Sequence, residues 1–226
     1  MKRHPSDAAV FLCVKMYQKE THFQSTPLRT SLLYTNMKRF VDLEVSEWQT
    51  LSAFIRENQI SKKTVVLRQG ESCRKFYFVE RGSLRAFQTN ANGKESTVMF
   101  AVEDWWITDM AAFMDKRTAD ISIEALENCV LFEIESTSMN KMLQSLPKLE
   151  KYFRILFQRA YVREQQRVLQ AISNTVEERY LGFLHKYPKI AEKISQRHIA
   201  SYLGVTPEFL RDRKSTRLNS SHRCIS

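Results

Sequence analysis

The sequence predicts an α+β protein in which a small β-barrel or jelly roll precedes a long helix and a pair of short helices. Three observations support this prediction. Between residues 63 and 135, short apolar runs alternate with glycine-containing turns, which is typical of strands. Residues 147–173 form one long stretch at helical spacing. Finally, Gly204, Thr206 and Pro207 mark a tight turn into a new helix.

The composition fits a soluble globular chain and excludes several classes. The 226 residues, 43% hydrophobic and 27% charged, suffice for one large or two small domains with a core. No run reaches the roughly 18 apolar residues of a membrane-spanning helix, so no membrane partner is expected. Four scattered cysteines without a CxxC pair predict free thiols in a reducing cytoplasm rather than a metal site: Cys13, Cys73, Cys129 and Cys224.

The net charge of +10 is unevenly distributed along the chain. Residues 40–135 hold eleven basic and sixteen acidic side chains, whereas residues 136–210 hold twelve basic and six acidic ones. The rest of the basic excess lies at the two ends. An acidic middle joined to a basic C-terminal half indicates two modules with different partners, and a basic module favours nucleic acid.

Both ends of the chain lack a regular pattern. Residues 1–36 are basic and a second Met-Lys-Arg begins at Met37, so we interpret 1–36 as a disordered or non-native extension. Residues 211–226 have few apolar anchors, which predicts an artefactual tail. The alternative is a genuine disordered basic tail that binds phosphates.

The sensor-like region is expected over residues 37–146. Residues 42–58 follow helical spacing, with Ser46 as a candidate N-cap. Residues 90–94, Asn-Ala-Asn-Gly-Lys, form a hairpin turn signal. Alternating or β-branched runs then predict the strands, which lie at 64–67, 76–79, 84–88, 97–100, 121–125 and 130–134.

The helix predicted over 147–173 would be about 40 Å long at 1.5 Å per residue. Its apolar residues Leu149, Phe153, Leu156 and Ala160 recur at spacings of four and three. This pattern predicts a dimerisation seam between two copies of the chain. The alternative is a core helix that packs on its own barrel, although this helix is longer than a small domain usually needs.

Residues 174–210 carry the most informative pattern. Ile199, Ala200 and Leu203 share one helix face, and Gly204 stands where a tight turn needs a positive φ. Thr206 is a good N-cap and Pro207 fits the first helical position. These are the features of a helix-turn-helix, whose second helix enters the major groove of double-stranded DNA. The alternative is an ordinary helical hairpin.

The roles of individual residues follow from that geometry. Residues at the start of the first helix are expected to contact phosphate, and those at the start of the second to lie at the base-reading end, where Glu208 can accept from cytosine N4. The candidate DNA-binding residues are Gln196, Arg197, His198, Thr206, Pro207, Glu208 and Arg211. His198 has no neighbouring His or Cys at ligand spacing, so no metal site is expected.

The order helix, barrel, long helix and helix-turn-helix resembles the bacterial Crp/Fnr family of transcriptional regulators. The resemblance covers about residues 37–210, and its most specific pieces are residues 65–71, 76–85 and 196–210. It implies a cyclic-nucleotide-binding-type, cupin-like jelly roll, a dimerising helix and a winged helix-turn-helix. It also implies homodimers that bind pseudo-palindromic promoter sites and contact RNA polymerase.

Nucleotide-binding members of that family have a Gly-Glu pair and then an Arg-Ser/Thr-Ala. The matching positions here are Thr108-Asp109 and Arg117-Thr118-Ala119, which makes Asp109, Met110, Arg117 and Thr118 the effector-binding candidates. Thr108 replaces the glycine, and Asp109 is shorter than Glu. A cyclic nucleotide is therefore not the favoured cofactor. The alternatives are another small effector or none.

The sequence thus predicts a cytoplasmic DNA-binding transcription regulator. The alternative is a small-molecule-binding jelly-roll protein whose recognition helix is truncated, so that it does not bind DNA productively. An enzyme is not expected, because the chain has no HExxH, GxxxxGK or GxSxG motif and residues 60–135 contain no histidine.

Overall fold

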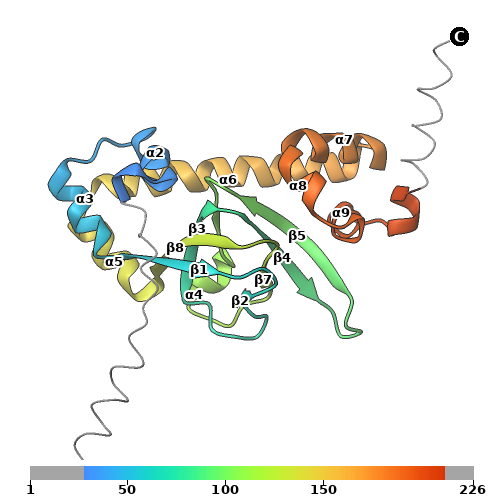
Figure 1. The fold of residues 1–226 in the computed structure, drawn as a ribbon, viewed down its shortest axis with the longest axis horizontal. Coiled ribbons are helices and arrows are strands. Elements are labelled where there is room, and N and C mark those ends of the chain that lie inside the picture. Colours follow the sequence, from blue (N-terminus) through green and yellow to red (C-terminus); the bar gives the residue numbers. More distant parts are fainter. Residues whose placement is uncertain (1–27, 212–226) are drawn as a thin grey trace, which may run out of the picture.

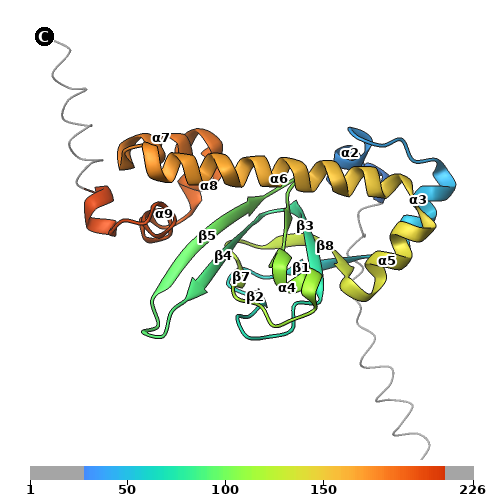
Figure 2. The same cartoon turned by 180° about the vertical axis from the view of Figure 1, so that it is seen from behind.

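A computed structural model describes residues 28–211 of the chain. Two antiparallel sheets form a β-sandwich, which we call the barrel. A single long helix, α6 (Lys148–Ser173), runs along one side of it (Figure 1). Helices from the N-terminal part of the chain gather at one end of α6 and the C-terminal helices at the other. The view from behind shows the same arrangement (Figure 2).

The two sheets have four strands each, in the orders β1-β8-β3-β6 and β2-β7-β4-β5. Adjacent strands pair antiparallel throughout, and the inward-facing residues of both sheets form one core around the fully buried Phe78, Leu84, Ile123 and Leu131. The β-barrel or jelly roll predicted from the short strands is therefore borne out in a coarser form, as a β-sandwich of two sheets. The strands are β1 (Ile55–Ile60), β2 (Val65–Leu67), β3 (Lys75–Arg81), β4 (Ser83–Thr89), β5 (Glu95–Val102), β6 (Trp106–Ile107), β7 (Ser122–Ala125) and β8 (Cys129–Glu135).

The hairpin between β4 and β5 turns through residues 90–94, as the sequence predicts. Asn90 Oδ1 accepts hydrogen bonds from the backbone N–H groups of Asn92 and Lys94, at 3.0 and 2.9 Å. Gly93 has a φ of +75°, which is the conformation that favours glycine.

The single helix predicted over residues 42–58 is wrong. Helix α3 (Val45–Ser52) ends early, and Ile55–Ile60 instead form β1, paired residue by residue with β8. Six ladder pairs at the sheet edge outweigh the weak helical spacing of this segment. The N-cap also differs from Ser46: Glu44 and Glu47 form a reciprocal capping box.

The predicted N-terminal extension is too long. Residues Leu28–Thr30 (η1) and Leu32–Lys38 (α2) belong to the folded domain, with Leu33 fully buried. The Glu80 carboxylate accepts hydrogen bonds from the backbone N–H groups of Leu32 and Leu33, at 2.8 and 3.2 Å, and so caps α2 from β3. The prediction for residues 1–27 lies outside the described residues.

The remaining helices connect the sandwich to the C-terminal end. Helix α4 (Met110–Asp115) follows β6, and α5 (Ser136–Ser145) follows β8 and ends before Pro147. After α6 come α7 (Val176–Lys186), α8 (Pro188–Lys193) and α9 (Gln196–Leu203). Residues Phe183, Tyr187, Ile199, Ala200, Leu203 and Leu210 form a second apolar cluster, which packs against Phe100 of β5.

Candidate functional site

The C-terminal helices have the local geometry of a helix-turn-helix. Ser195 caps α9, and Gly204 ends it in the left-handed conformation with a φ of 72°. Thr206 Oγ1 then accepts from the backbone N–H of Phe209 at 3.2 Å and caps a helix that runs from Pro207 to Arg211. Of the tail predicted over residues 211–226, Arg211 is the last residue of this helix that the structure describes, and residues 212–226 lie outside the described residues.

The apolar face that joins the two helices is the predicted one. Ile199 and Ala200 are fully buried and Leu203 nearly so, and Leu210 of the second helix packs into the same cluster. By contrast, Arg197, Thr206, Glu208 and Arg211 are exposed, and Pro207 is half-buried. These four side chains are therefore accessible to a partner outside the chain.

Two of the candidate DNA-binding residues are less accessible. Gln196 and His198 are half-buried, and Gln196 Oε1 and His198 Nδ1 have no hydrogen-bond partner among the described residues. Burial lowers the pKa of His198, and the neighbouring Arg85 of the barrel lowers it further. The structure thus places His198 beside the barrel rather than on the open surface.

Helix α9 is also held directly by strand β5. The Ser201 hydroxyl accepts from the backbone N–H of Thr97 at 2.8 Å and donates to the carbonyl of Glu95 at 3.2 Å. Glu95 and Glu124 both pair with the buried Arg85, at 2.6 and 2.8 Å. This contact between the barrel and the C-terminal helices had no signal in the sequence, because it depends on tertiary docking.

Two of the four effector-binding candidates, Asp109 and Arg117, are engaged by other groups of the protein. Asp109 is the N-cap of α4, and its two carboxylate oxygens accept from the backbone N–H groups of Ala112 at 3.1 Å and Asp120 at 2.7 Å. The exposed Arg117 pairs with Asp120 at 2.8 Å, and this hydrogen bond raises the pKa of Arg117. Thr118 is exposed, and Met110 lines a cavity together with Thr108 and Ile121.

That cavity has a volume of about 730 Å³ and lies between the barrel, α6 and the C-terminal helices. Its barrel side includes Phe76, Trp105 and Trp106, and α6 contributes basic side chains. Tyr187 and Tyr202 line its other end. The cavity is within the size range of small-molecule sites, and sequence reasoning missed it because its walls come from distant segments.

The four residues expected at a dimer seam all lie on the barrel side of α6. Leu149 and Phe153 are buried in the core of their own chain, Leu156 packs against that core, and Ala160 lines the cavity. This is the packing that the sequence left open as the alternative for these positions.

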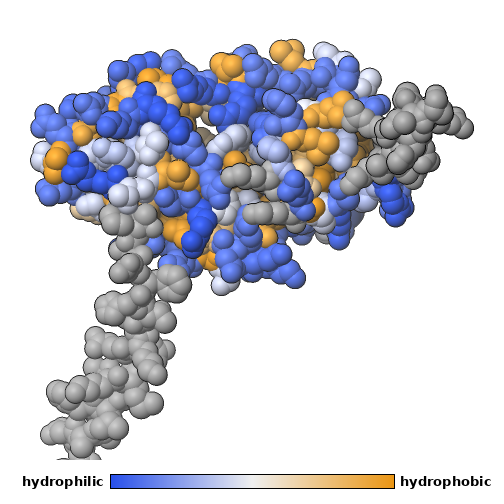
Figure 3. Space-filling model, turned by 45° about the horizontal axis from the view of Figure 1, so that its top comes forward, coloured by the Kyte–Doolittle hydropathy of each residue, from blue (hydrophilic) through white to orange (hydrophobic). Residues whose placement is uncertain are grey.

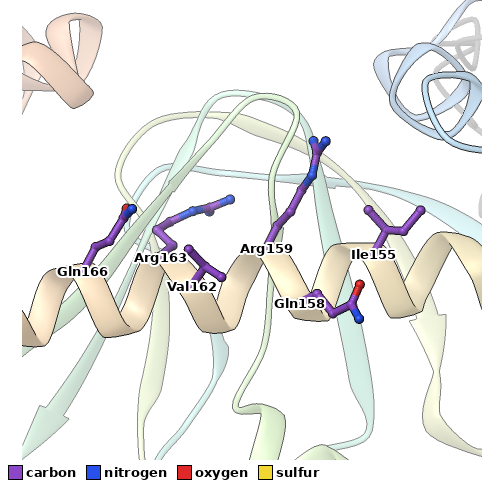
Figure 4. Close-up of a pocket in the computed structure, with 6 residues that line it drawn as sticks. All are labelled: Ile155, Gln158, Arg159, Val162, Arg163 and Gln166. Atoms are coloured by element: carbon purple, nitrogen blue, oxygen red, sulfur yellow. The ribbon is translucent and has the colours of Figure 1, made fainter.

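A different face of α6 is open and carries apolar residues. Ile155, Val162 and Leu169 recur every seven residues, and Val162 and Leu169 are 50% and 61% exposed. Ile155, Gln158 and Val162 line a depression of about 460 Å³, for which α6 alone provides the described lining. Figure 4 shows these side chains along the helix. Figure 3 brings this side forward and shows hydrophobic residues scattered among hydrophilic ones. The seven-residue spacing is visible in the sequence and could have identified this face.

Other site classes have no support in residues 28–211. No group of three or more His, Cys, Asp or Glu side chains in this part of the chain could hold a metal ion. Among these residues, no helix is both long and apolar enough to cross a membrane. Cys73 and Cys129 are buried free thiols whose pKa values are raised by burial.

Comparison with known proteins is consistent with this arrangement. The cyclic nucleotide-binding domain family matches residues 57–146. The transcriptional activator protein anr of Pseudomonas aeruginosa is 24% identical over 180 residues, which cover 74% of this chain and 73% of that protein.

Solved structures of two regulators share the fold. The c-di-GMP responsive global regulator CLP of Xanthomonas campestris superposes with a TM-score of 0.63 at 18% identity, over 79% of this chain and 93% of that one. A transcriptional regulator of the crp/fnr family from Eubacterium rectale gives a TM-score of 0.61 at 19% identity, over 76% and 82% of the two chains.

Proposed function

The chain belongs to the Crp/Fnr family of transcriptional regulators, whose members are not enzymes, and from this premise we propose that it binds a pseudo-palindromic DNA site as a cytoplasmic homodimer. The observation that carries the proposal is the turn at Gly204 between two capped helices with a shared buried face. Such a turn sets the second helix at the angle that major-groove entry requires.

The exposed residues of this unit divide into two roles. Arg197 stands at the start of α9, where the first helix of such a motif crosses the DNA backbone. Thr206 and Glu208 lie at the N-terminal end of the second helix, which faces base edges. RNA polymerase is the further partner that the family suggests.

The dimer of this proposal is formed through α6. The open face with Ile155, Val162, Leu169 and Ile172 follows 7-7-3 spacing, and Gln158 and Gln165 complete a heptad seam. The barrel-facing residues Leu149 and Phe153 are already used within the chain. The two helix-turn-helix units of such a dimer would then read two half-sites about one turn of the DNA apart.

DNA selection from a random pool with the full chain tests the proposal. We expect enrichment of an inverted repeat, with affinity that falls linearly in log–log plots against salt. Arg197→Ala should weaken binding to all sequences and reduce the salt slope by about 1, whereas Glu208→Ala should relax base preference at one position.

The exposed Arg56 provides a control, because it lies on β1, whereas α9 contacts β5 in the other sheet. Arg56→Ala should leave affinity and salt slope unchanged. A pool that shows no enrichment, together with binding insensitive to salt, would overturn the proposal. That result would support a small-molecule-binding sandwich protein instead.

A further inference from the structure

The helix that follows the turn at Gly204 carries an exposed aromatic side chain. Phe209 is 39% exposed, whereas the next residue, Leu210, is 2% exposed and packs in the apolar cluster of the C-terminal helices. The backbone N–H of Phe209 donates to Thr206 Oγ1 at 3.2 Å, which places Phe209 in the first turn of this helix. A partner that covers this turn would therefore also cover the phenyl ring.

The exposed neighbours of Phe209 are polar or charged. Thr206, Glu208 and Arg211 lie on the same short stretch, and each is exposed. Successive residues of a helix are turned by 100°, so Phe209 stands between the buried Leu210 and the exposed Glu208. This surface thus presents an apolar ring beside a carboxylate, and the two side chains suit different chemical groups on a partner.

The major groove of DNA offers an apolar group at one base. Guanine, adenine and cytosine present hydrogen-bonding atoms there, whereas thymine adds its C5-methyl group. A phenyl ring placed over a polar base edge would take that edge from water without replacing its hydrogen bonds. Over a thymine methyl, both partners lose apolar contact with water instead. A phenyl ring at this position therefore favours thymine and disfavours the other bases.

We propose that Phe209 is a specificity-determining residue that packs on the C5-methyl of one thymine in each half-site. This inference rests on the proposed function, in which the second helix enters the major groove. Glu208 precedes Phe209 directly, and its carboxylate accepts from cytosine N4 in that proposal. Because base pairs are stacked 3.4 Å apart, the thymine should lie within about two base pairs of that cytosine.

Uracil substitution isolates the methyl group. Deoxyuridine lacks the C5-methyl of thymidine and pairs with adenine in the same way. In the inverted repeat that the full chain enriches, each thymine is replaced in turn by deoxyuridine, and binding is measured with the wild-type chain. We expect one thymine position per half-site to respond, with affinity about fourfold lower for each half-site substituted, as for one methyl group left in water.

Substitutions then assign the effect to the ring. Phe209→Ala should bind the thymine and uracil sites equally, and Phe209→Leu should keep part of the difference, because its side chain is still apolar. Neither variant should change the salt slope, since no phosphate contact is removed. The matched control is Met114→Ala, at a hydrophobic residue that is 65% exposed on α4, and it should keep the full fourfold ratio. A purely structural role for Phe209 would weaken both sites by one factor and leave the ratio unchanged.

The outcomes separate this inference from the proposed function. A random pool without an enriched site would overturn both. An enriched site at which no thymine responds to uracil, or a Phe209→Ala variant that keeps the wild-type ratio, would overturn the role of Phe209 and leave DNA binding in place. The uracil scan uses the wild-type chain, so its result does not depend on the folding of a variant.

Discussion

The indole Nε1 of Trp106 donates a 2.7 Å hydrogen bond to the hydroxyl of Tyr152, and this buried contact ties the barrel to the long helix α6. The same hydroxyl donates to Asn36 Oδ1 at 2.7 Å, and Asn36 Nδ2 donates to the Asp104 carboxylate at 2.8 Å. One phenol oxygen therefore connects α2, β6 and α6. Its burial raises the pKa of Tyr152, so the phenol stays protonated at physiological pH and can donate.

Tyr152→Phe removes that oxygen and leaves two buried polar groups without a partner. We expect the free energy of unfolding to fall by about 1–3 kcal/mol, as urea titration can measure. Tyr161→Phe is the control, because the Tyr161 side chain lies 65% exposed on the same helix. Equal free energies of unfolding for the two variants would show that the hydrogen bonds of the Tyr152 hydroxyl do not stabilise the fold.

Leu33 tests whether the segment before Met37 belongs to the folded unit. Leu33 is fully buried in the main core, so Leu33→Ala should cost about 2–5 kcal/mol of unfolding free energy. Val45→Ala, at a position 52% exposed, should change stability by less than about 0.5 kcal/mol. A chain that begins at Met37 should lose at least as much stability as Leu33→Ala, and unchanged urea midpoints would contradict this.

Two glycines with positive φ should respond differently to alanine. A Cβ at Gly93 meets nothing within 4 Å, so Gly93→Ala should cost only the backbone strain of about 1–2 kcal/mol. A Cβ at Gly82 would lie 2.7 Å from Cys129 Sγ and 3.0 Å from the Asn128 carbonyl. Gly82→Ala should therefore lower the melting temperature more than Gly93→Ala, and the reverse order would refute the tight approach of β3–β4 to β8.

The strands and the turn at Gly204 were predictable because local rules and tertiary packing agree there. Alternation, glycine turns and the Gly204–Thr206–Pro207 pattern all follow from short-range chemistry. The helix prediction was wrong for residues 55–60, because pairing with β8 outweighs a weak helical period. The predicted end of the N-terminal extension at residue 36 was wrong, because the cap from Glu80 and the burial of Leu33 depend on residues far away in the sequence.

The candidate sites show the same division. Gly204 and Thr206 lie where the pattern put them, since a turn is a local feature. Two of the effector-binding candidates that the family resemblance implies are engaged within the protein, because Asp109 caps α4 and Arg117 pairs with Asp120. The cavity could not be predicted from the sequence, since its cations and its rings come from segments far apart in the chain.

Acidification should weaken the contact between α9 and the barrel through His198. Its neighbouring charged groups are Arg85, Glu124 and Glu95 of the barrel and Arg197 of its own helix, and burial is the largest cause that holds its pKa below 6.5. Above pH 6.5 the imidazole is neutral in the folded and unfolded states, so it has no effect. As the pH falls below 6.5, the unfolded state takes up the proton first, and stability declines until the pH passes the lower folded pKa.

Hydrogen exchange of α9 amides between pH 7.5 and 5, corrected for intrinsic rates, measures this effect. His198→Gln should flatten the pH dependence, whereas His185→Gln, at an exposed position of α7, should keep it. Loss of protection at low pH that is the same in both variants would assign the effect to other groups.

We expect two copies of the chain to associate through the open face of α6. Leu169→Glu places a charge in the seam proposed for two copies, where it would be buried without a partner, and so should convert a dimer to a monomer. Val168→Glu is the matched comparison: Val168 is 52% exposed and flanks the line of Ile155, Val162 and Leu169, at a heptad position where a charge can reach solvent. Light scattering after size exclusion gives the mass of each variant.

Both glutamates add the same charge to the same helix at neighbouring positions, so a general effect of charge or helix propensity would act on them equally. A dimer in Val168→Glu and a monomer in Leu169→Glu would assign the interface to the seven-residue seam. If Val168→Glu alone lost its partner, the interface would instead lie on the side of α6 that carries Phe157 and Tyr161, which are also exposed. A monomeric wild-type chain would remove the dimer from the proposed function and leave DNA recognition to a single helix-turn-helix, with one half-site enriched in the selection.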